Sequence, residues 1–345
     1  MRTMTENTQD DGLSQTYLQI SPNILESFPK FRPPVDLYFF DQGIAQVKKI
    51  HKAEERLATE KQAQVAGFSR DSLLYLLRDD YRVYAQHLSK RLGLVLVEDD
   101  FKPQEVAEIF FLAFRDHMNA FLEQPKEGPL KVLVKDISIL AEYLWADPCR
   151  VEFLTKTLHK DYSLAVHSVN TMLIGLALFA MASQGKLDRG DLISLALGLI
   201  LHDLGMTNVP KFIVDKEQYL VRRDRDSIEK HIEAGERMLK RLDIGDAIVV
   251  ECITQHHERT DGSGYPERRK GSAISMAGKL CAVADSFSAI IGDRPYHDAK
   301  VFNDAAATLA KDTKRYEPIL TKLLVTLIIE GWSTCKSPDR TANPG

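Results

Sequence analysis

The sequence lacks an excess of charge of either sign. Its 45 lysines and arginines against 49 aspartates and glutamates leave a formal net charge of -4, and the isoelectric point is near 6.2. A chain so close to neutral has no overall field that would attract a nucleic acid polymer or an anionic membrane. Any phosphate group must therefore be bound by a local set of residues.

Long apolar runs and a leader peptide are also missing. The longest apolar runs, residues 171–182 and 192–201, are shorter than the roughly 18 to 20 residues that cross a bilayer. They predict buried helices and no membrane span. The polar, acidic N-terminus MRTMTENTQDDGLSQ has no apolar core and no cleavage site, so the expected location is cytoplasmic.

Cysteine is scarce and unpaired in the sequence. The four cysteines, Cys149, Cys252, Cys281 and Cys335, lie far apart without a CxxC pair. Cys252 and Cys281 fall in apolar, helical stretches. We therefore expect reduced cysteines in the core and no metal or redox role for them.

The residues that are present follow two kinds of pattern. Residues 17 to about 95 mix short β-like runs, YLQI and VDLYFF, with charged amphipathic stretches such as AQVKKIHKAEERLA. From about residue 103 the period is helical, and PKEGP at 125–129 breaks the first long helix. The predicted fold class is α+β, with a small N-terminal α/β domain followed by an all-helical domain.

These changes of pattern predict the organisation of the chain. We expect a disordered tail at 1–16, a small α/β domain at 17–100, a linker helix at 101–130, a helical domain at 131–332 and a disordered tail at 333–345. The helices of the large domain are expected near 131–145, 148–159, 163–183, 190–204, 227–242, 245–258, 272–292, 302–312 and 316–330. Asp226 and Glu229 have the form of a capping box, and Gly185 stands where a helix would end.

The small domain carries no identifiable chemistry. It has no acidic phosphoacceptor cluster in a βα frame, no Cys/His ligand set and no glycine-rich phosphate loop. We interpret it as a regulatory or oligomerisation element.

Histidine and aspartate gather in the helical domain. Five of the ten histidines lie between residues 167 and 257, each on or at the end of a predicted helix. A single such histidine is usually an ordinary core or surface residue, but buried carboxylates accompany these five and are costly unless a cation or donors meet them. The set predicts a metal site formed by His167, His202, Asp203, His231, His256, His257 and Asp285.

Two pairs of these residues are adjacent in the sequence. Neighbouring helical positions point about 100° apart, so adjacent ligands suit two ions better than one. Asp203 has two carboxylate oxygens and would bridge the two ions, which makes it the expected catalytic centre. Two metals roughly 3.5 to 4 Å apart clamp the attacking and leaving oxygens of a displacement at phosphorus and lower the pKa of a bound water. The pattern predicts hydrolysis of a phosphate ester.

The stretch HHERTDGSGYP, residues 256–266, places a turn directly after the second pair. Gly262 and Gly264 allow positive φ and close approach of the backbone, and Pro266 favours an extended Tyr265. An ordinary helix-ending turn would explain the glycines equally well. It would not explain why the turn follows two ligands.

Together these motifs resemble the HD-GYP family of bacterial cyclic-dinucleotide phosphodiesterases. The resemblance rests on HDLG at 202–205, VP at 209, His231 in KHIEAGERML, HHERTDGSGYP, and VADSFSAIIGDRPY at 283–296. The segment from YLQISPNIL to LLYLLRDDYRVYAQHL resembles, more distantly, a small N-terminal domain that precedes some members.

The resemblance implies an HD-type catalytic domain with a binuclear or trinuclear iron or manganese centre, which hydrolyses cyclic di-GMP to pGpG or GMP. By position, His167, His202, Asp203 and Asp285 would hold one metal, and Asp203, His231, His256 and His257 the second. The expected substrate contacts are Arg294, Tyr265, Gly264 and Lys216, although Arg294 could also be a solvated residue at a helix end. Signalling proteins and a second copy of the chain are further expected partners.

Two positions depart from the family pattern. Members often carry a lysine that reaches a substrate phosphate where this chain has Met206, and Lys211, Lys216 or His297 could partly replace it. Trinuclear members carry a glutamate one helical turn before the first histidine, where this chain has Ser163. The second departure predicts two metals and not three.

Two other interpretations remain open. One is an HD-type phosphohydrolase of another nucleotide, which the missing lysine at Met206 favours. The other is a degenerate domain that binds a cyclic dinucleotide or a protein as a signalling module. The complete set of seven ligands disfavours the degenerate domain, because a retired site has no reason to keep every one.

Overall fold

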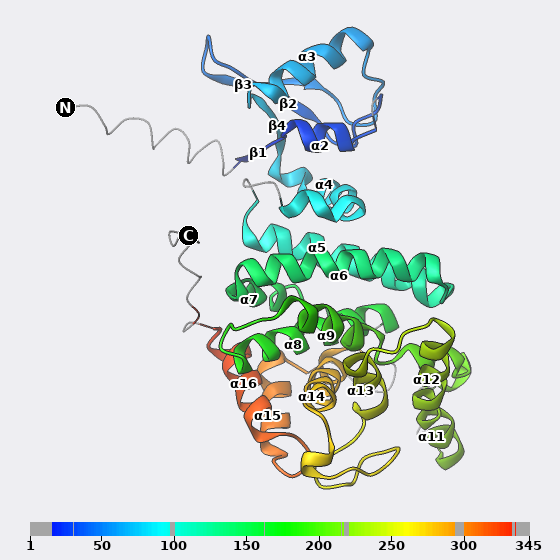
Figure 1. Ribbon diagram of the computed structural model, residues 1–345. Helices are drawn as coiled ribbons and strands as arrows, with labels where there is room; N and C mark the ends of the chain where they lie inside the picture. Colours follow the sequence, from blue (N-terminus) through cyan, green and yellow to red (C-terminus); the bar gives the residue numbers. More distant parts are fainter. Residues whose placement is uncertain are drawn as a thin grey trace, which may run out of the picture. The chain divides into compact units, whose positions relative to one another are not determined.

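The computed structural model describes residues 16–29, 31–96, 101–161, 163–214, 216, 221–293, 300–332 and 335. Its contacts divide the chain into two compact units, residues 1–113 and 114–345, with the division inside helix α5 (Figure 1). The predicted tails at 1–16 and 333–345 lie outside the described residues apart from Thr16 and Cys335.

Unit 1 is built on a four-stranded antiparallel sheet in the order β1-β4-β2-β3. The strands are β1 (Tyr17–Gln19), β2 (Leu37–Asp41), β3 (Gln46–His51) and β4 (Leu74–Leu77). The helices are α2 (Pro22–Ser27), α3 (Thr59–Arg70), α4 (Tyr81–Leu88) and the first part of α5 (Pro103–Glu123), with 3-10 turns η1 (Arg78–Asp80) and η2 (Ser89–Leu96). Phe39 of β2 stacks on Phe68 of α3 with ring centroids 4.5 Å apart, which fixes that helix on the sheet.

Strand β3 was not recognised in the sequence, where it formed part of a charged amphipathic stretch. It lies at the edge of the sheet and pairs only with β2 among the described strands. Edge strands accept lysines because one side faces solvent. Here Lys48 forms an ion pair with Asp41 of β2, and Lys49 forms one with Asp36, which directly precedes β2.

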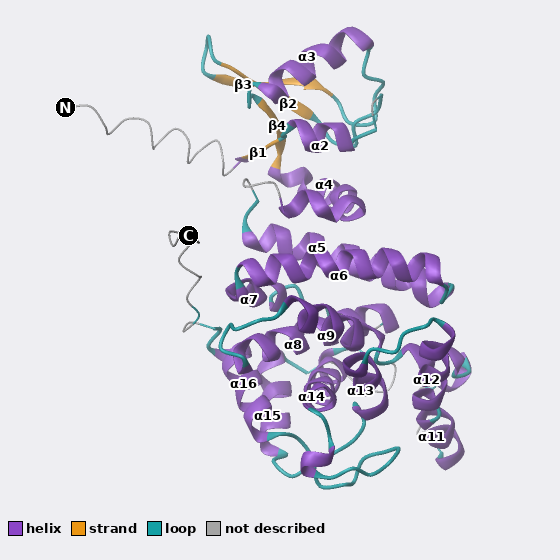
Figure 2. Ribbon diagram, in the orientation of Figure 1, coloured by secondary structure: helices purple, strands orange, loops and turns teal. Residues whose placement is uncertain are grey.

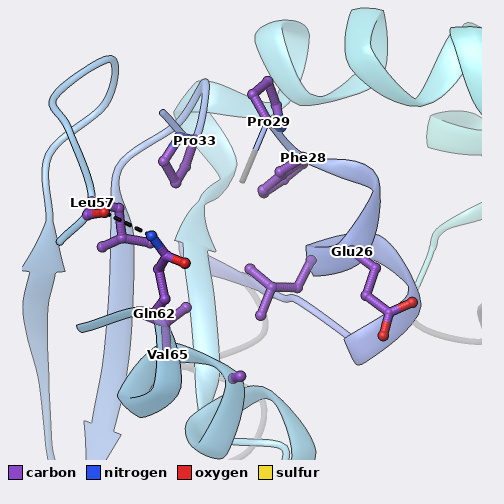
Figure 3. Close-up of a pocket in the computed structure, with 9 residues that line it drawn as sticks. Glu26, Phe28, Pro29, Pro33, Leu57, Gln62 and Val65 are labelled. Carbon is purple, nitrogen blue, oxygen red and sulfur yellow. Dashed lines mark hydrogen bonds between the residues drawn. The ribbon is translucent and has the colours of Figure 1, made fainter. Parts of the chain in front are cut away.

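Unit 1 contains a pocket of about 480 Å³ beside α2 and α3 (Figure 3). Most of its lining is apolar and includes Phe28, Leu57 and Val65. Its polar residues are Glu26 and Gln62, and the Gln62 Nε2 donates to the Leu57 carbonyl at 2.9 Å. The lining has no histidine or cysteine, so the predicted chemistry lies elsewhere.

The described part of unit 2 consists of helices and loops (Figure 2). After α5 the long elements are α6 (Glu127–Ala146), α8 (Leu164–Ala182), α9 (Arg189–Leu201), α12 (His231–Arg241), α13 (Ala247–Gln255), α14 (Met276–Ile291), α15 (Phe302–Lys311) and α16 (Pro318–Ile329). The short ones are η3 (Pro148–Arg150), α7 (Val151–Thr155), η4 (Leu204–Asn208), α10 (Lys211–Val214), α11 (Arg222–Glu229) and η5 (Gly271–Ala273). The predicted α+β fold class is confirmed.

Helix α8 forms the centre of unit 2. Its sequence, LAVHSVNTMLIGLALFAMA, is apolar on every side, and a helix of this kind is stable only when surrounded. Helices α7, α9, α14 and α16 pack around it, while α13 packs against α9 and α14. The start of α8, the ends of α9 and α13, and the middle of α14 carry predicted ligands.

The helix ends bear out one local prediction and overturn another. Gly185 follows α8 with φ +76°, and its N–H donates to the Ala180 carbonyl at 2.9 Å, as expected for a helix-ending glycine. The predicted capping box at Asp226 is wrong. Helix α11 already begins at Arg222, so Asp226 lies inside it, and the expected helix at 227–242 is two helices, α11 and α12.

Two helical stretches of unit 2 match a membrane span in length and hydropathy. Among the described residues they are Leu164–Ala182 and Arg189–Asn208, whose most apolar windows are 89% and 61% buried inside the protein. Because the core already covers most of this apolar surface, the match is weak evidence for a span.

The expectation of four reduced cysteines is wrong for two of them. Cys149 in η3 and Cys335 after α16 form a disulfide across 186 residues of sequence. The fold brings their Cα atoms to 5.6 Å, a proximity that sequence spacing does not reveal. Cys252 and Cys281 are free and buried, as expected.

Candidate metal centre

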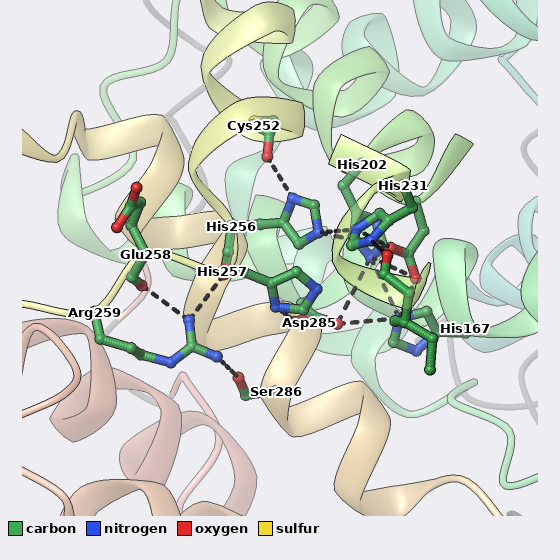
Figure 4. A network of polar contacts seen from close by, with 12 residues as sticks. His167, His202, His231, Cys252, His256, His257, Glu258, Arg259, Asp285 and Ser286 are labelled. Atoms are coloured by element: carbon green, nitrogen blue, oxygen red, sulfur yellow. Dashed lines mark hydrogen bonds and ion pairs between the residues drawn. The ribbon is translucent and has the colours of Figure 1, made fainter. Parts of the chain in front are cut away.

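The seven predicted ligands form two neighbouring groups in unit 2, and Figure 4 labels all of them except Asp203. His167 lies in the first turn of α8, His202 and Asp203 follow α9, His231 begins α12, His256 and His257 follow α13, and Asp285 lies inside α14. Their ligand atoms form two groups: His167, His202 and Asp285 in one, and Asp203, His231, His256 and His257 in the other.

The first group also reaches one oxygen of Asp203. The His167 Nε2 lies 3.1 Å from Asp285 Oδ1 and 3.6 Å from Asp203 Oδ2. The His202 Nε2 lies 3.7 Å from each of the same two oxygens. Two imidazole nitrogens and two carboxylate oxygens thus surround one position.

The second group uses the other oxygen of Asp203. Its Oδ1 lies 3.3 Å from the His231 Nε2 and 3.6 Å from the His256 Nε2. A ligand atom of His257 lies within 4.8 Å of the other ligand atoms in this group. Because Oδ1 faces one group and Oδ2 the other, the Asp203 carboxylate has the geometry of a bridge between two cations.

Backbone carbonyls orient three of the imidazoles. The Nδ1 of His202 lies 2.8 Å from the Leu199 carbonyl, that of His231 2.6 Å from Ile228, and that of His256 3.0 Å from both Cys252 and Ile253. A proton on each Nδ1 can be donated to these carbonyls, which leaves the Nε2 lone pair directed at the centre. Such second hydrogen bonds are typical of histidines that bind metals.

The short distance between two histidine Nε2 atoms shows whether a cation fits the site. The His231 Nε2 and His256 Nε2 lie 3.2 Å apart, and both rings hold their Nδ1 against a carbonyl. Two Nε2 lone pairs at this distance repel each other unless a positive charge lies between them. The donor set therefore fits a metal cation better than it fits neutral histidines alone.

The charges of the site also favour a metal cation. Burial opposes ionisation of Asp203, but the surrounding histidines, His202 first among them, outweigh it and hold the pKa of Asp203 well below its usual range. Burial likewise opposes protonation of His202, but Asp203 and Asp285 raise the pKa of His202 to about 8. Burial lowers the pKa of His257 well below its usual range, which keeps that imidazole neutral as metal binding requires. The centre is an anionic site that favours a cation.

The accessible side of the centre lies at two of the ligands. The side chains of Asp203 and His257 are 14% and 22% exposed, whereas those of the remaining ligands are nearly fully buried. The Tyr265 ring stacks on His257 with centroids 4.7 Å apart. A substrate would therefore approach past Asp203, His257 and Tyr265.

Two glycines are required by close packing of the backbone at the ligands. A Cβ on Gly205 would collide with the His231 carbonyl, so this glycine lets η4 lie against the start of α12. A Cβ on Gly264 would collide with the His257 carbonyl and the Arg259 amide nitrogen. Gly264, predicted as a substrate contact, is placed by the structure against the backbone that carries His257.

Of the other expected substrate contacts, one is paired with another residue and one lies outside the described residues. Lys216 forms an ion pair with Asp224 of α11. Met206, in η4, is partly exposed, and Lys211 is exposed. Arg294 and His297 lie outside the described residues.

Ser163 has a role that the sequence did not indicate. It does not continue the face of α8 but caps the helix, and its Oγ accepts a hydrogen bond from the Val166 N–H at 3.1 Å. The Ser163 carbonyl accepts the His167 N–H at 2.9 Å, so Ser163 lies one turn before His167 as the cap of the helix.

Two buried charged residues beside the predicted ligands were assigned no role by the sequence. Glu258 is 1% exposed, and its two oxygens accept the N–H groups of Glu267 and Arg269 at 2.8 and 2.9 Å, which holds the turn that carries Tyr265. Arg259 is 8% exposed and binds backbone carbonyls beside the ligands. The available signal was two charged residues directly after two predicted ligands.

Comparison with known proteins finds relatives of the helical part of the chain. Residues 154–320 match the HD domain family. The chain is 31% identical over 153 residues to the cyclic di-GMP phosphodiesterase PA4108 of Pseudomonas aeruginosa, covering 44% of this chain and 36% of that protein. It is 34% identical over 134 residues to the 3'3'-cGAMP-specific phosphodiesterase 2 of Vibrio cholerae, covering 38% and 25%.

A solved structure shares the fold. Bd1817, a HDG"Y"P protein from Bdellovibrio bacteriovorus, superimposes with a TM-score of 0.59 at 17% identity over 90% of this chain and 99% of that one. Residues 154–320 are thus similar to the HD domain family, and the chain shares its fold with this HDG"Y"P protein. It spans well under half the length of the two phosphodiesterases above.

Proposed function

We propose that the protein is a metal-dependent phosphodiesterase that hydrolyses a cyclic dinucleotide, with cyclic di-GMP as substrate and pGpG or GMP as product. The observation that carries this proposal is the Asp203 carboxylate, whose two oxygens face two separate groups of histidines. A shared carboxylate between two nitrogen-rich positions suits a pair of divalent cations and a phosphate ester.

Each metal position would have its own ligands. His167, His202 and Asp285 would complete the first around Asp203 Oδ2, and His231, His256 and His257 the second around Asp203 Oδ1. Imidazole and carboxylate ligands without a thiolate suit iron or manganese. When bound, such a pair supplies Lewis acidity toward the phosphoryl oxygens and lowers the pKa of a water.

The chain's own residues would orient the substrate. The exposed edges of Asp203 and His257 leave room for the phosphodiester, and the Tyr265 ring offers an apolar surface beside them. Arg294 and Lys216 remain candidate phosphate contacts by their place in the family motif and near it.

The names of the relatives support the substrate class and leave one choice within it. Both cyclic di-GMP and 3'3'-cGAMP enzymes lie at about the same identity to this chain. The two substrates share the cyclic diphosphate ring and differ in one base. We place cyclic di-GMP first and treat 3'3'-cGAMP as the second candidate.

Unit 1 would serve regulation or assembly. Its described residues include none of the predicted ligands, and the lining of its pocket has no histidine or cysteine. We expect the protein to act in the cytoplasm, with signalling proteins or a second copy of the chain as partners.

The proposal is tested on protein loaded anaerobically with iron or with manganese. We expect two metals per chain, and release of a linear dinucleotide from cyclic di-GMP with 3'3'-cGAMP assayed in parallel. Asp203→Asn keeps the size of the side chain but weakens the bridge. It should lose metal and reduce turnover by more than about 100-fold, since even outer-shell partners are worth 10- to 100-fold.

Two results would contradict the proposal. Full metal content and turnover in Asp203→Asn would remove the bridging role. Binding of the cyclic dinucleotide without hydrolysis by wild-type protein holding both metals would favour a signalling module instead.

A further inference from the structure

A buried arginine links the elements that carry the two ligand groups (Figure 4). Arg259 follows α13 two residues after His257 and is 8% exposed. Its Nη1 donates to the carbonyls of His256 and Glu258, both at 2.9 Å. Its Nη2 donates to the Ser286 hydroxyl at 3.4 Å, and Ser286 directly follows Asp285 on α14.

The aromatic ring of Tyr316 completes the surroundings of this guanidinium. The ring lies 4.9 Å from the Arg259 Cζ, and the Tyr316 hydroxyl donates to Ser286 Oγ at 2.9 Å. Ser286 Oγ therefore accepts from both residues and is fixed between them. Arg259, Ser286 and Tyr316 form a closed network.

The charge of Arg259 is directed at carbonyls and not at a partner acid. Among the residues the structure describes, no carboxylate lies within ion-pair distance of it. Its Nη1 instead meets carbonyls at the C-terminal end of α13, where the helix dipole is negative. A buried cation with this arrangement serves to hold one helix end in place.

Arg259 contacts one element from each of the two ligand groups. One end of the fork binds the backbone of His256, a ligand of the second group. The other end binds the neighbour of Asp285, a ligand of the first group. We infer that Arg259 is a positioning residue that sets the separation between the two ligand groups, and hence between the two metals. This inference rests on the proposed two-metal function.

The chemistry of arginine suits this role and that of lysine does not. A guanidinium is planar and presents several N–H groups in fixed directions, so it can bind two carbonyls and a hydroxyl at once. An ammonium keeps the charge but cannot span the same acceptors in a fixed plane. Arg259→Lys should therefore preserve the buried charge and lose the link.

The test uses three variants of the full chain loaded with manganese. Arg259→Lys removes the fork, and Ser286→Ala removes only its attachment to α14. Arg150→Lys is a matched control, because Arg150 also donates to a carbonyl, that of Tyr143, and lies 4.2 Å from the Tyr143 ring. Metal content, the electron paramagnetic resonance of the manganese pair, and kcat and KM for cyclic di-GMP are measured for each.

We expect Arg259→Lys to change the exchange coupling of the manganese pair and to lower kcat about tenfold, with KM within about threefold of wild type. Ser286→Ala should change the coupling while keeping two metals, with a smaller loss in kcat. Arg150→Lys should match the wild type in coupling and kinetics. The split between kcat and KM separates altered metal spacing from altered substrate binding.

Two failures can be told apart. If wild-type protein shows no coupled pair or no hydrolysis, the proposed function fails and this inference with it. If wild type shows both, and neither Arg259→Lys nor Ser286→Ala alters the coupling or kcat, Arg259 only packs the core and the inference alone is wrong. Should Arg259→Lys not fold, Ser286→Ala decides.

Discussion

At the scale of single residues, Gly264 shows how a short motif shapes the centre. Its lack of a side chain lets the turn lie directly against the backbone at His257 and Arg259. The requirement is a close approach of two backbone segments and not a positive φ. A methyl group here must push the turn away from His257 or displace His257 itself.

We therefore predict that Gly264→Ala damages the centre more than the fold. Metal affinity and kcat should each fall more than about tenfold, because a ligand that moves by a few tenths of an ångström loses its alignment. Metal titration and steady-state kinetics measure the effect. Gly245→Ala is the matched control, since a Cβ there meets nothing within 4 Å. Equal behaviour of the two variants would contradict the packing argument.

At Met206 a substitution is expected to raise activity and not to lower it. It lies three residues after Asp203, where the family resemblance predicts a lysine, and it is partly exposed. If its side chain borders the substrate, Met206→Lys adds a cation beside a phosphate. We predict about a tenfold rise in kcat/KM for cyclic di-GMP, near the lower end of what a charge-assisted hydrogen bond contributes.

The neutral variant Met206→Gln controls for the added length and polarity. It should leave kcat/KM within about twofold of wild type. A lysine variant no better than the glutamine variant would mean that position 206 does not border the phosphate. In that case 3'3'-cGAMP or another nucleotide would be the first substrate to assay next.

At the scale of helices and strands, the sequence predicted what has a regular apolar period. Helices α8, α9, α13 and α14 were expected close to their observed bounds, because buried faces leave a clear pattern. The start of helix α11 and strand β3 were not expected, for the opposite reason. Helix α11 buries none of its residues, and β3 is a lysine-rich edge strand, so neither has an apolar face to detect.

The candidate ligands could be recognised because their chemistry is visible in the sequence, whereas the residues that hold them in place could not. Histidines and aspartates stand out in apolar helices. The roles of Ser163 and Arg259 depend on hydrogen bonds to backbone groups, to Val166 N–H and to the His256 carbonyl. Such contacts exist only after the fold has formed.

Ser163 carries a prediction about the start of α8. Its side chain caps the helix, and its carbonyl accepts the His167 N–H at 2.9 Å, so the cap holds the turn that presents this ligand. Ser163→Ala should lower the free energy of unfolding by about 1 kcal/mol. It should also weaken metal retention, whereas Ser163→Asp, a good cap, should restore both. Chemical unfolding and metal titration check this.

Two outcomes would count against this account. Ser163→Ala with unchanged stability would mean that the cap contributes nothing to the fold. Loss of metal in Ser163→Asp at wild-type stability would mean that the serine acts on the centre by another route.

At the scale of the whole molecule, the Cys149–Cys335 disulfide joins η3 to the segment after α16. It was not predictable, since partners 186 residues apart leave no spacing pattern. It also conflicts with the expectation of a reduced, cytoplasmic protein, because disulfides are rare in reducing compartments. The redox state of this pair therefore reports on the environment in which the protein folds.

The disulfide closes a loop of 186 residues, and constraining so long a loop lowers the entropy of the unfolded chain by an amount worth up to about 5 kcal/mol. We predict that reduction of metal-free protein with a phosphine lowers its free energy of unfolding by several kcal/mol. Cys149→Ser should be destabilised to the same extent and should show no further loss with reductant. Thiol titration in denaturant must find two free thiols before reduction and four after it. Four free thiols in protein purified from an oxidising medium, or equal stability with and without reductant, would show that the cysteines stay apart and that the chain is held by its helical core alone.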